Sequence, residues 1–302
     1  MRPRSPIYIV SKGRFNTPFT SRRLDRMGVP HRMIVEEQEL EDYAKTIARH
    51  KLLVLPQKYL DDYDTFWHDT DPRKGSGAAR NYAWDHAITQ GADKHWVMDD
   101  NIRHFCRLNR NERINVRTGA IFRAAEDFVD RYENVAMSGL EYRGFVSSRE
   151  KKSPYRLNAR IYSCNLIRND VPYRWRGRYN EDTDLSLRML KDGWVTVLFH
   201  AFLQEKSATQ TVKGGNTTEL YGEGTKKKSQ MLIDMHPDVT RMVFRFHRWH
   251  HLVDYSPFKN NRLHKKANLN IPHGVNEYGM TLVETQSGRQ RETPRPLKTG
   301  TA

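Results

Sequence analysis

The chain has 302 residues, with 51 Lys or Arg against 36 Asp or Glu and a formal net charge of +15, so a polyanionic partner is compatible with the charge but not required by it. This length suits one large α/β domain, or two small ones, and the apolar runs are far shorter than the ~20 residues that a membrane-spanning helix needs. Two cysteines, Cys106 and Cys164, are too few for a disulfide scaffold or a multi-cysteine metal site.

The first third of the chain predicts alternating strands and helices. Strands are expected over residues 7–10, 31–35 and 51–55, with helices over 18–27 and 40–49. This alternation favours βαβ units and a parallel sheet.

Polar residues follow the first two predicted strands. Ser11 and Arg14 come after the first strand, and Glu36 comes after the second. Ligands of open α/β sheets bind at the carboxyl ends of the strands, so these side chains are candidates for one binding edge. For each residue taken alone, an ordinary solvated turn is the favoured explanation. Because the first strand breaks at once into this polar turn, no signal peptide is predicted and a cytoplasmic location is expected.

A glycine-rich turn from Arg73 to Asn81 opens a predicted helix over 82–88. The start of a helix presents backbone N–H groups and a positive dipole end to an anion, which makes Gly75 and Arg80 candidates for binding phosphate. A flexible loop can have the same composition. The position favours the functional interpretation, because this helix runs directly into the next predicted strand.

That strand, predicted over 95–98, ends abruptly in Asp99, Asp100 and Asn101. Adjacent carboxylates repel each other unless a cation or solvent screens them, and Mg²⁺ or Mn²⁺ favours oxygen ligands and phosphate. The pattern therefore suggests a site for a metal and a diphosphate. For an isolated Asp pair, a water-exposed turn is the commoner explanation.

The middle of the chain predicts strands over 102–108, 134–139 and 158–167, with a helix over 121–132. The segment 143–156 is basic and carries interleaved aromatic residues. Such a pattern suits a nucleic-acid surface, although a solvated loop is at least as good an explanation.

A second acidic cluster, Glu181, Asp182 and Asp184, opens a predicted helix over 181–190. The helix dipole stabilises carboxylates in the first turn, and capping explains one acid well but three poorly. A carboxylate held at a helix start beside a reacting hydroxyl could serve as a general base.

The last third begins with a strong strand over 194–199 that closes on His200, which could complete a metal site with the carboxylates. A lone histidine after a strand is more often a packing residue. A glycine loop over 210–217 contains Lys213 and suggests a lid. The segment 240–266 is rich in Arg, His and aromatic residues and predicts a basic helix, and the polar end of the chain is expected to be disordered.

In chain order, the glycine-rich turn with Arg80, the Asp-Asp-Asn motif at 99–101 and the Glu-Asp-Thr-Asp motif at 181–184 resemble inverting GT-A glycosyltransferases. The resemblance spans residues 7 to about 218. It implies a Rossmann-like α/β fold with a mixed sheet flanked by helices, and Mn²⁺ or Mg²⁺ held by the first acidic motif against the diphosphate of a UDP-sugar. It also implies Asp182 as the catalytic base. Asn101 replaces the final acid of the first motif, which leaves open whether Asp99 or Asp100 contacts the metal.

Shorter motifs resemble the TET/JBP-associated glycosyltransferases more narrowly. They are the opening segment 9–14, the strand end at 35–37 and the loop at 213–216. Members of this group, many from bacteriophages, are relatives of the base J glucosyltransferase. The resemblance implies transfer of a sugar, glucose by expectation, to hydroxymethylpyrimidines in double-stranded DNA, with host cytoplasm as the location of a phage protein. Such a target base is expected to leave the stack.

These arguments divide the candidate residues by role. Catalysis is predicted for Asp182 and Glu181. Donor binding is predicted for Ser11, Arg14, Glu36, Gly75, Arg80, Asp99 and Lys213. Metal binding is predicted for Asp99, Asp100, Asn101 and His200. Contact with acceptor DNA is predicted for Arg143, Lys151, Lys152, Trp175, Arg176, Arg178 and Tyr179.

Three parts are predicted along the chain: a GT-A domain over 1–236, a basic helical extension over 237–283 and a disordered tail over 284–302. Two other functions fit the same residues. One is a GT-A enzyme acting on a polysaccharide or protein, and the other is a non-catalytic nucleic-acid-binding protein whose acids only cap helices. The enzyme hypotheses require that the carboxylates near positions 100 and 182 face one shared cavity.

Overall fold

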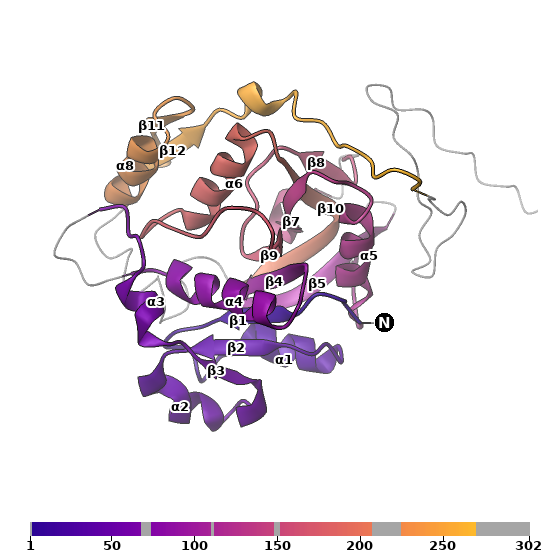
Figure 1. Ribbon diagram of the computed structural model, residues 1–302, viewed down its shortest axis with the longest axis vertical. Helices are drawn as coiled ribbons and strands as arrows, with labels where there is room; N and C mark the ends of the chain where they lie inside the picture. Colours follow the sequence, from indigo (N-terminus) through magenta and orange to yellow (C-terminus); the bar gives the residue numbers. More distant parts are fainter. Residues whose placement is uncertain (1, 68–73, 110–111, 148–151, 207–224, 270–302) are drawn as a thin grey trace, which may run out of the picture. The chain divides into compact units, whose positions relative to one another are not determined.

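A computed structural model describes residues 2–67, 74–109, 112–147, 152–206 and 225–269. Its large sheet has the strand order β3-β2-β1-β4-β9-β7-β10-β5-β6, with β8 paired to β10 (Figure 1). The strands of this sheet are β1 (Ile7–Val10), β2 (Arg32–Val35), β3 (Leu52–Val54), β4 (Lys94–Asp99), β5 (Ile102–Asn109), β6 (Glu112–Asn115), β7 (Val135–Tyr142), β8 (Tyr155–Leu157), β9 (Cys164–Arg168) and β10 (Val195–Lys206).

The sheet is parallel in its first part and mixed in the rest. Strands β3, β2, β1 and β4 are parallel neighbours, as the strand and helix alternation predicted. Strand β9 is antiparallel to both β4 and β7, while β10 is parallel to β7 and antiparallel to β5. The expectation of a mixed sheet is therefore confirmed. The register also sets the site, because Val10 pairs with Asp99 and Ile102 pairs with Lys206.

The helices lie on both faces of this sheet (Figure 1). On one face, Trp84 of α4 and Leu185 and Met189 of α6 belong to one buried cluster with side chains of the strands. On the other face, Phe122 of α5 packs against Trp96, with ring centroids 5.3 Å apart. The helices are α1 (Phe19–Arg26), α2 (Leu40–Ala44), α3 (Gln57–Asp61), α4 (Gly77–Thr89), α5 (Ala120–Val129), α6 (Glu181–Lys191) and α8 (Lys226–Met235), and short 3-10 turns cover 37–39, 49–51, 143–145 and 256–258.

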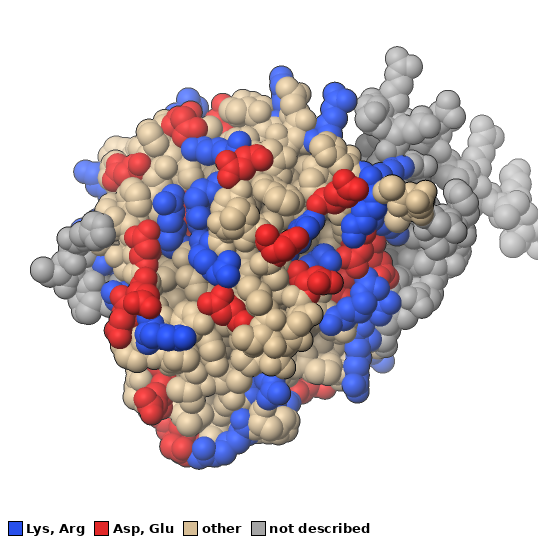
Figure 2. Space-filling view, in the orientation of Figure 1, with Lys and Arg blue, Asp and Glu red and all other residues tan. Residues whose placement is uncertain are grey.

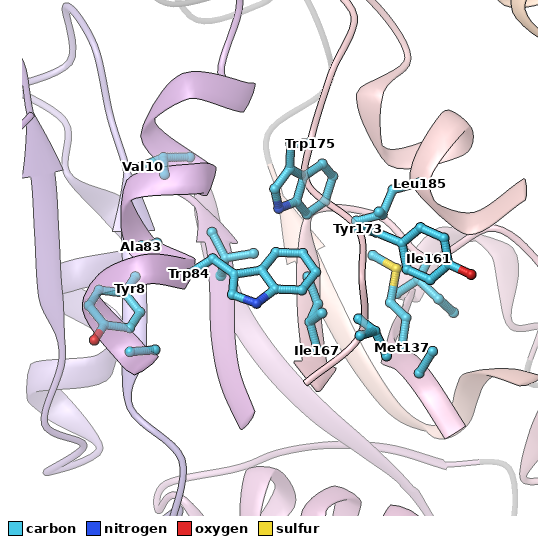
Figure 3. Close-up of a cluster of buried hydrophobic side chains, with 14 of the residues drawn as sticks. Tyr8, Val10, Ala83, Trp84, Met137, Ile161, Ile167, Tyr173, Trp175 and Leu185 are labelled. Atoms are coloured by element: carbon cyan, nitrogen blue, oxygen red, sulfur yellow. The ribbon is translucent and has the colours of Figure 1, made fainter. Parts of the chain in front are cut away.

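Trp84 lies at the centre of the main core cluster. Figure 3 shows it between Tyr8 on one side and Met137 and Leu185 on the other, with Trp175 beside it. Its indole N–H donates to the carbonyl of Asn169 at 3.3 Å, so its polar atom is satisfied inside the core. This packing fixes α4 and α6 on the same face, and both helices begin at the same end of the sheet.

The prediction of a basic helix over 240–266 is wrong. Strands β11 (Thr240–Arg245) and β12 (Arg248–Val253) form an antiparallel hairpin instead. Alternating β-branched and aromatic residues favour a strand, and Phe244 pairs across the hairpin with Trp249. The prediction failed because the many Arg and His residues of this segment hid the two-residue period of its apolar side chains.

The base of the hairpin packs on α6. Leu187 and Leu190 of α6 form a buried cluster with Val239 and Phe258, and Val253 packs against it. One compact unit spans residues 1–266. The boundaries predicted at 236 and 283 stay predictions. Within the described residues, no helix has both the length and the apolar character needed to cross a membrane.

Candidate active site

A cavity of about 300 Å³ lies at the carboxyl ends of the parallel strands. It contains residues from both acidic motifs, so Asp99, Asp100 and Asp182 face one shared space as the sequence argument required. The predicted residues that line it are Ser11, Arg14, Glu36, Gly75, Arg80, Asp99, Asp100, Asn101, Glu181 and Asp182. Lys213, the remaining predicted donor residue, lies outside the described residues.

Asp99 at the end of β4 carries two cationic partners. Its Oδ1 accepts a hydrogen bond from Arg80 at 2.7 Å, and its Oδ2 accepts one from the Lys206 ammonium at 3.0 Å. Burial alone would raise the pKa of Asp99, but Lys206 and Arg80 outweigh it and hold that pKa far below its usual value. Burial works against the charged form of Lys206, but Asp99 and Tyr142 outweigh it and raise the Lys206 pKa. The cavity floor therefore carries one permanent anion between two permanent cations.

Asp100 belongs to a buried network instead. It is 3% exposed, and its carboxylate accepts hydrogen bonds from Ser11 at 2.6 Å and from Arg14 at 2.5 Å. The Ser11 hydroxyl also lies 2.6 Å from the Tyr43 hydroxyl. Burial raises the pKa of Asp100, and Arg14 opposes that rise. Since the register places Val10 beside Asp99, this network joins the turns that follow β1 and β4.

The glycine-rich turn is packed tightly against the rest of the site. A Cβ at Gly77 would lie 1.8 Å from the Tyr63 hydroxyl, and a Cβ at Gly75 would lie 2.7 Å from the Arg178 carbonyl oxygen. Gly75 also has a φ of +79°, which glycine adopts most readily. Only glycine fits such close approaches, so this turn is held in one position and the flexible-loop explanation does not apply to its described part.

This turn holds Glu181 through Ser76. The Ser76 hydroxyl donates to Glu181 at 2.6 Å, and Arg80 lies 3.9 Å from the same carboxylate. Burial raises the pKa of Glu181, and the positive charge of Arg80 opposes that rise. Arg80 therefore lies between both acidic motifs, with its guanidinium 4.8 Å from the ring centroid of Trp175.

The acids at the start of α6 have three different environments. Asp184 is fully buried and bonds Arg176, Arg188 and His236, so it anchors the helix in the core. Glu181 is held by Ser76. Asp182 lines the cavity, and its Oδ1 accepts the backbone N–H of Thr183 at 2.8 Å. Asp182 is thus fixed by the first turn of the helix while facing the cavity.

The donor atoms of the predicted metal ligands fit a hard cation only in part. Within the described residues, no group of three or more His, Cys, Asp or Glu is placed to hold a metal ion. The Oδ1 of Asn101 is buried with no hydrogen-bond partner among the described residues, and it is a suitable oxygen. Asp99 also lines the cavity, but both of its oxygens already accept hydrogen bonds, from Arg80 and Lys206. Asp100 is engaged by Ser11 and Arg14.

His200 lies elsewhere in the sheet. It sits inside β10 rather than at its end, and its Nδ1 is 3.0 Å from the carbonyl oxygen of Ser153. It is not part of the described lining of the cavity. The strand continues to Lys206, whose ammonium reaches Asp99.

Three of the residues predicted to contact acceptor DNA are buried. Trp175, Arg178 and Tyr179 are 1%, 2% and 3% exposed, so the two rings offer no open face for stacking. Arg176 bonds Asp184. Their role as acceptor contacts stays a prediction, and this burial counts against base stacking on the two rings.

The basic segment 143–156 is also engaged in local contacts. Arg143 pairs with Glu205 at 2.6 Å, and Lys152 donates to the carbonyl of Phe145 at 2.7 Å. Lys151 lies outside the described residues. On the face in Figure 2, acidic and basic side chains are interspersed, so the net charge of +15 is not gathered into one patch there.

The cavity has further residues that the sequence analysis missed. The polar and aromatic ones are Lys12, Tyr142, Arg160, Tyr162, Ser163, Asn180, Lys206 and Lys228. Burial works against the charged form of Arg160, but Asp182 and nearby phenols outweigh it and raise the Arg160 pKa. No local sequence signal marks Lys206, because only the pairing of β10 with β5 places it opposite Ile102, which directly follows the acidic turn. Lys228 belongs to a run of three lysines, 226–228, which gave no signal of its own.

Comparison with known families agrees with this site. The family model described as TET-Associated Glycosyltransferase matches residues 5–215, more than two thirds of the chain. The matched range covers both acidic motifs and the glycine-rich turn, and it ends before α8 and the hairpin. No curated protein matches the chain. The resemblance inferred from the short motifs is confirmed.

Proposed function

The chain belongs to the TET-associated glycosyltransferases, and from this premise we propose that it transfers glucose from UDP-glucose to the hydroxyl group of a hydroxymethylpyrimidine in DNA. The observation that carries the proposal is the shared cavity, in which Asp182 of α6 and Asp99 of β4 face the same space. The family name supports modified DNA as the acceptor class, and the positive net charge agrees with a polyanionic substrate.

The cations around Asp99 would stabilise the departing nucleoside diphosphate. Sugar transfer breaks the bond between the anomeric carbon and the diphosphate, which leaves with that electron pair, and fixed positive charges lower the energy of the developing anion. Arg80 and Lys206 are held in the cavity by Asp99 before any donor arrives. A divalent Mn²⁺ or Mg²⁺ held by Asp99 and Asn101 would add positive charge opposite the diphosphate.

Asp182 is the proposed general base. It would accept the proton of the acceptor hydroxyl while that oxygen attacks the anomeric carbon from the face opposite the diphosphate, which inverts the configuration. Its Oδ1 is fixed by the Thr183 N–H, so the carboxylate is oriented before the acceptor binds. Glu181, held by Ser76 and near Arg80, would act as a positioning residue for this helix start.

A transfer assay tests the proposal. The protein is incubated with labelled UDP-glucose and Mn²⁺, and with duplex DNA that either carries 5-hydroxymethylcytosine or 5-hydroxymethyluracil or is unmodified. Label is expected on a hydroxymethylated duplex alone. The Asp182→Asn variant should lose about 10³-fold in rate, the size expected for removal of a general base. Its melting temperature should still rise with UDP and Mn²⁺, because donor binding is retained.

Asp238→Asn is the matched control. Asp238 carries the same carboxylate, but its side chain is 57% exposed and pairs with Lys191 away from the cavity. This variant should retain full transfer. Absence of label from every duplex with the wild-type protein would refute DNA as the acceptor, and full activity of Asp182→Asn would refute the assignment of the base.

A further inference from the structure

The hairpin of β11 and β12 has the composition of a nucleic-acid contact. Residues 240–253 contain three Arg, three His and three large aromatic residues, and no Asp or Glu. Among the described residues, the exposed large hydrophobic side chains include Phe244 at 59%, Phe246 at 83% and Trp249 at 39%. Arginine among exposed aromatic rings complements a phosphate backbone with unstacked bases, because phosphates attract the cations and bases stack on the rings.

The hairpin register separates its two faces. Phe244 pairs with Trp249, and their ring centroids lie 5.1 Å apart. Since side chains alternate along a strand, Met242 and His251 form the next pair on the same face, followed by Thr240 and Val253. Val253 packs against the α6 cluster. This face therefore runs from the core of the protein out to an exposed aromatic pair.

Two contacts place the aromatic pair beside the cavity. The Lys226 ammonium lies 5.9 Å from the ring centroid of Trp249, and the Thr225 hydroxyl donates to the Trp249 carbonyl at 2.6 Å. Lys228, two residues further along the first turn of α8, lines the cavity together with Asp182. The start of α8 thus contacts the aromatic pair through Thr225 and Lys226 and the cavity through Lys228.

The position of the next pair, Met242 and His251, supports this placement of the aromatic pair. His251 lies between the aromatic pair and the buried base of the hairpin, and its pKa is lowered to about 4 by burial and by the positive charges of Arg160 and Lys228, against the opposing effect of Asp182. Pairs on the same face repeat about every 7 Å along a strand. The aromatic pair therefore lies about 7 Å along the strand from His251, whose pKa depends on the charges of Arg160, Lys228 and Asp182.

We infer that Phe244 and Trp249 form a stacking platform for the target nucleotide of a DNA strand, beside Asp182, while Arg245 and Arg248 contact its phosphates. The platform rests on the proposed function for the identity of the acceptor. It lies outside the range matched by the family model, which ends at residue 215. A base on these rings has left the duplex stack, and the platform therefore holds a displaced base rather than a paired one.

The test uses a fluorescein-labelled duplex with one 5-hydroxymethylcytosine, and a second duplex with 2-aminopurine next to that base, whose fluorescence rises when its neighbour leaves the stack. The double variant Phe244→Ser/Trp249→Ser should weaken DNA binding about tenfold or more and abolish the 2-aminopurine rise. Its melting temperature shift with UDP and Mn²⁺ should equal that of the wild type, which shows an intact donor site.

Ile88→Ser is the control, because Ile88 is also an exposed apolar side chain, at 43%, and lies on α4 outside both the hairpin and the lining of the cavity. It should keep wild-type DNA affinity and the 2-aminopurine rise. In a separate variant, Arg245→Gln/Arg248→Gln should lower the slope of log affinity against log salt by about two. Equal losses in the Ile88 variant, or wild-type DNA binding by the double aromatic variant, would overturn the inference.

These outcomes separate the inference from the proposed function. Sugar transfer to DNA by the wild type with unchanged kinetics in the double aromatic variant would reject the platform alone. Hairpin-dependent DNA binding by a wild type that transfers no sugar would reject the proposed reaction and leave the platform standing.

Discussion

The donor side of the cavity and the β11–β12 hairpin differ in the exposure and the pairing of their cationic side chains. Around Asp99, the cations Arg80 and Lys206 are both paired, and Arg80 is buried with its side chain 4% exposed, while Lys206 is half-buried. On the hairpin, Arg245 and Arg248 are exposed and stand among exposed aromatic rings. Buried pairs are screened little by salt and hold fixed positions, whereas exposed cations can rearrange around a flexible partner. The comparison separates a preorganised site from an adaptable surface.

The largest expected effect comes from breaking the buried pairing. Arg80→Met removes a cation from between Asp99 and Glu181 and leaves two carboxylates with less compensation. Removal of one partner from a buried pair typically costs about 3 kcal/mol or more of unfolding free energy. Urea denaturation should show this loss, and the melting shift with UDP should disappear.

Arg49→Met provides the exposed counterpart. Arg49 pairs with Glu41, and both side chains are more than half exposed. Exposed pairs contribute about 0–1 kcal/mol, so its unfolding midpoint should stay near that of the wild type. Similar losses in both variants would mean that the buried pairing around Asp99 has no special energetic role.

The second largest effect is expected from acid, which should lower the unfolding free energy through the buried His95. His95 on β4 is fully buried, its Nδ1 lies 2.6 Å from Asn169, and burial lowers its pKa from 6.5 to about 4. Between these values the unfolded chain binds more protons than the folded one, so stability falls as the pH decreases from 6.5 to 4. The shift corresponds to about 3 kcal/mol for this residue.

Urea midpoints measured at pH 7.5 and at pH 4 test this effect. The wild type should lose more stability than His95→Gln between the two conditions, because the variant lacks the titrating ring. Equal losses would assign the acid sensitivity to other groups.

The strands and the helix start that form the donor side of the cavity could be predicted from the sequence. The apolar runs that end at Val10 and Met98 are short and are followed by polar residues, and this pattern predicted both strands and the place where each one ends to within a residue. The first turn of α6 was found from its acids and the apolar spacing of Leu185 and Met189. Local patterns were sufficient because one segment carries each signal.

The remaining features depend on contacts between distant segments. Strand β10 was predicted to end at His200, and only its pairing with β5 shows that it continues to Lys206. Trp175 and Tyr179 were interpreted as acceptor contacts, but an aromatic residue has the same local pattern whether its ring is buried or exposed. The hairpin was not predicted because it is stabilised by cross-strand pairs such as Phe244 with Trp249, and such pairs join residues of two separate strands.

The smallest effect is expected at the tip of the hairpin. Phe246 and His247 have φ angles of 51° and 59°, a conformation that non-glycine residues adopt less readily and that Asn tolerates better. Phe246→Asn should therefore raise the unfolding free energy by up to about 0.5 kcal/mol. Thermal melting would measure it, with Phe145→Asn as the exposed control, and a clear decrease would show that the ring contributes to folding.

The two ends of the hairpin lie next to each other, and this determines which part of it can vary in length. Thr240 and Val253 are cross-strand partners, so fourteen consecutive residues leave the body of the protein and return to it at neighbouring positions. Only the tip beyond Phe244 and Trp249 can change in length without moving the chain on either side, because Trp249 contacts the start of α8 and Val253 packs on α6. The length of this tip can thus vary while the cavity that contains both acidic motifs stays in place.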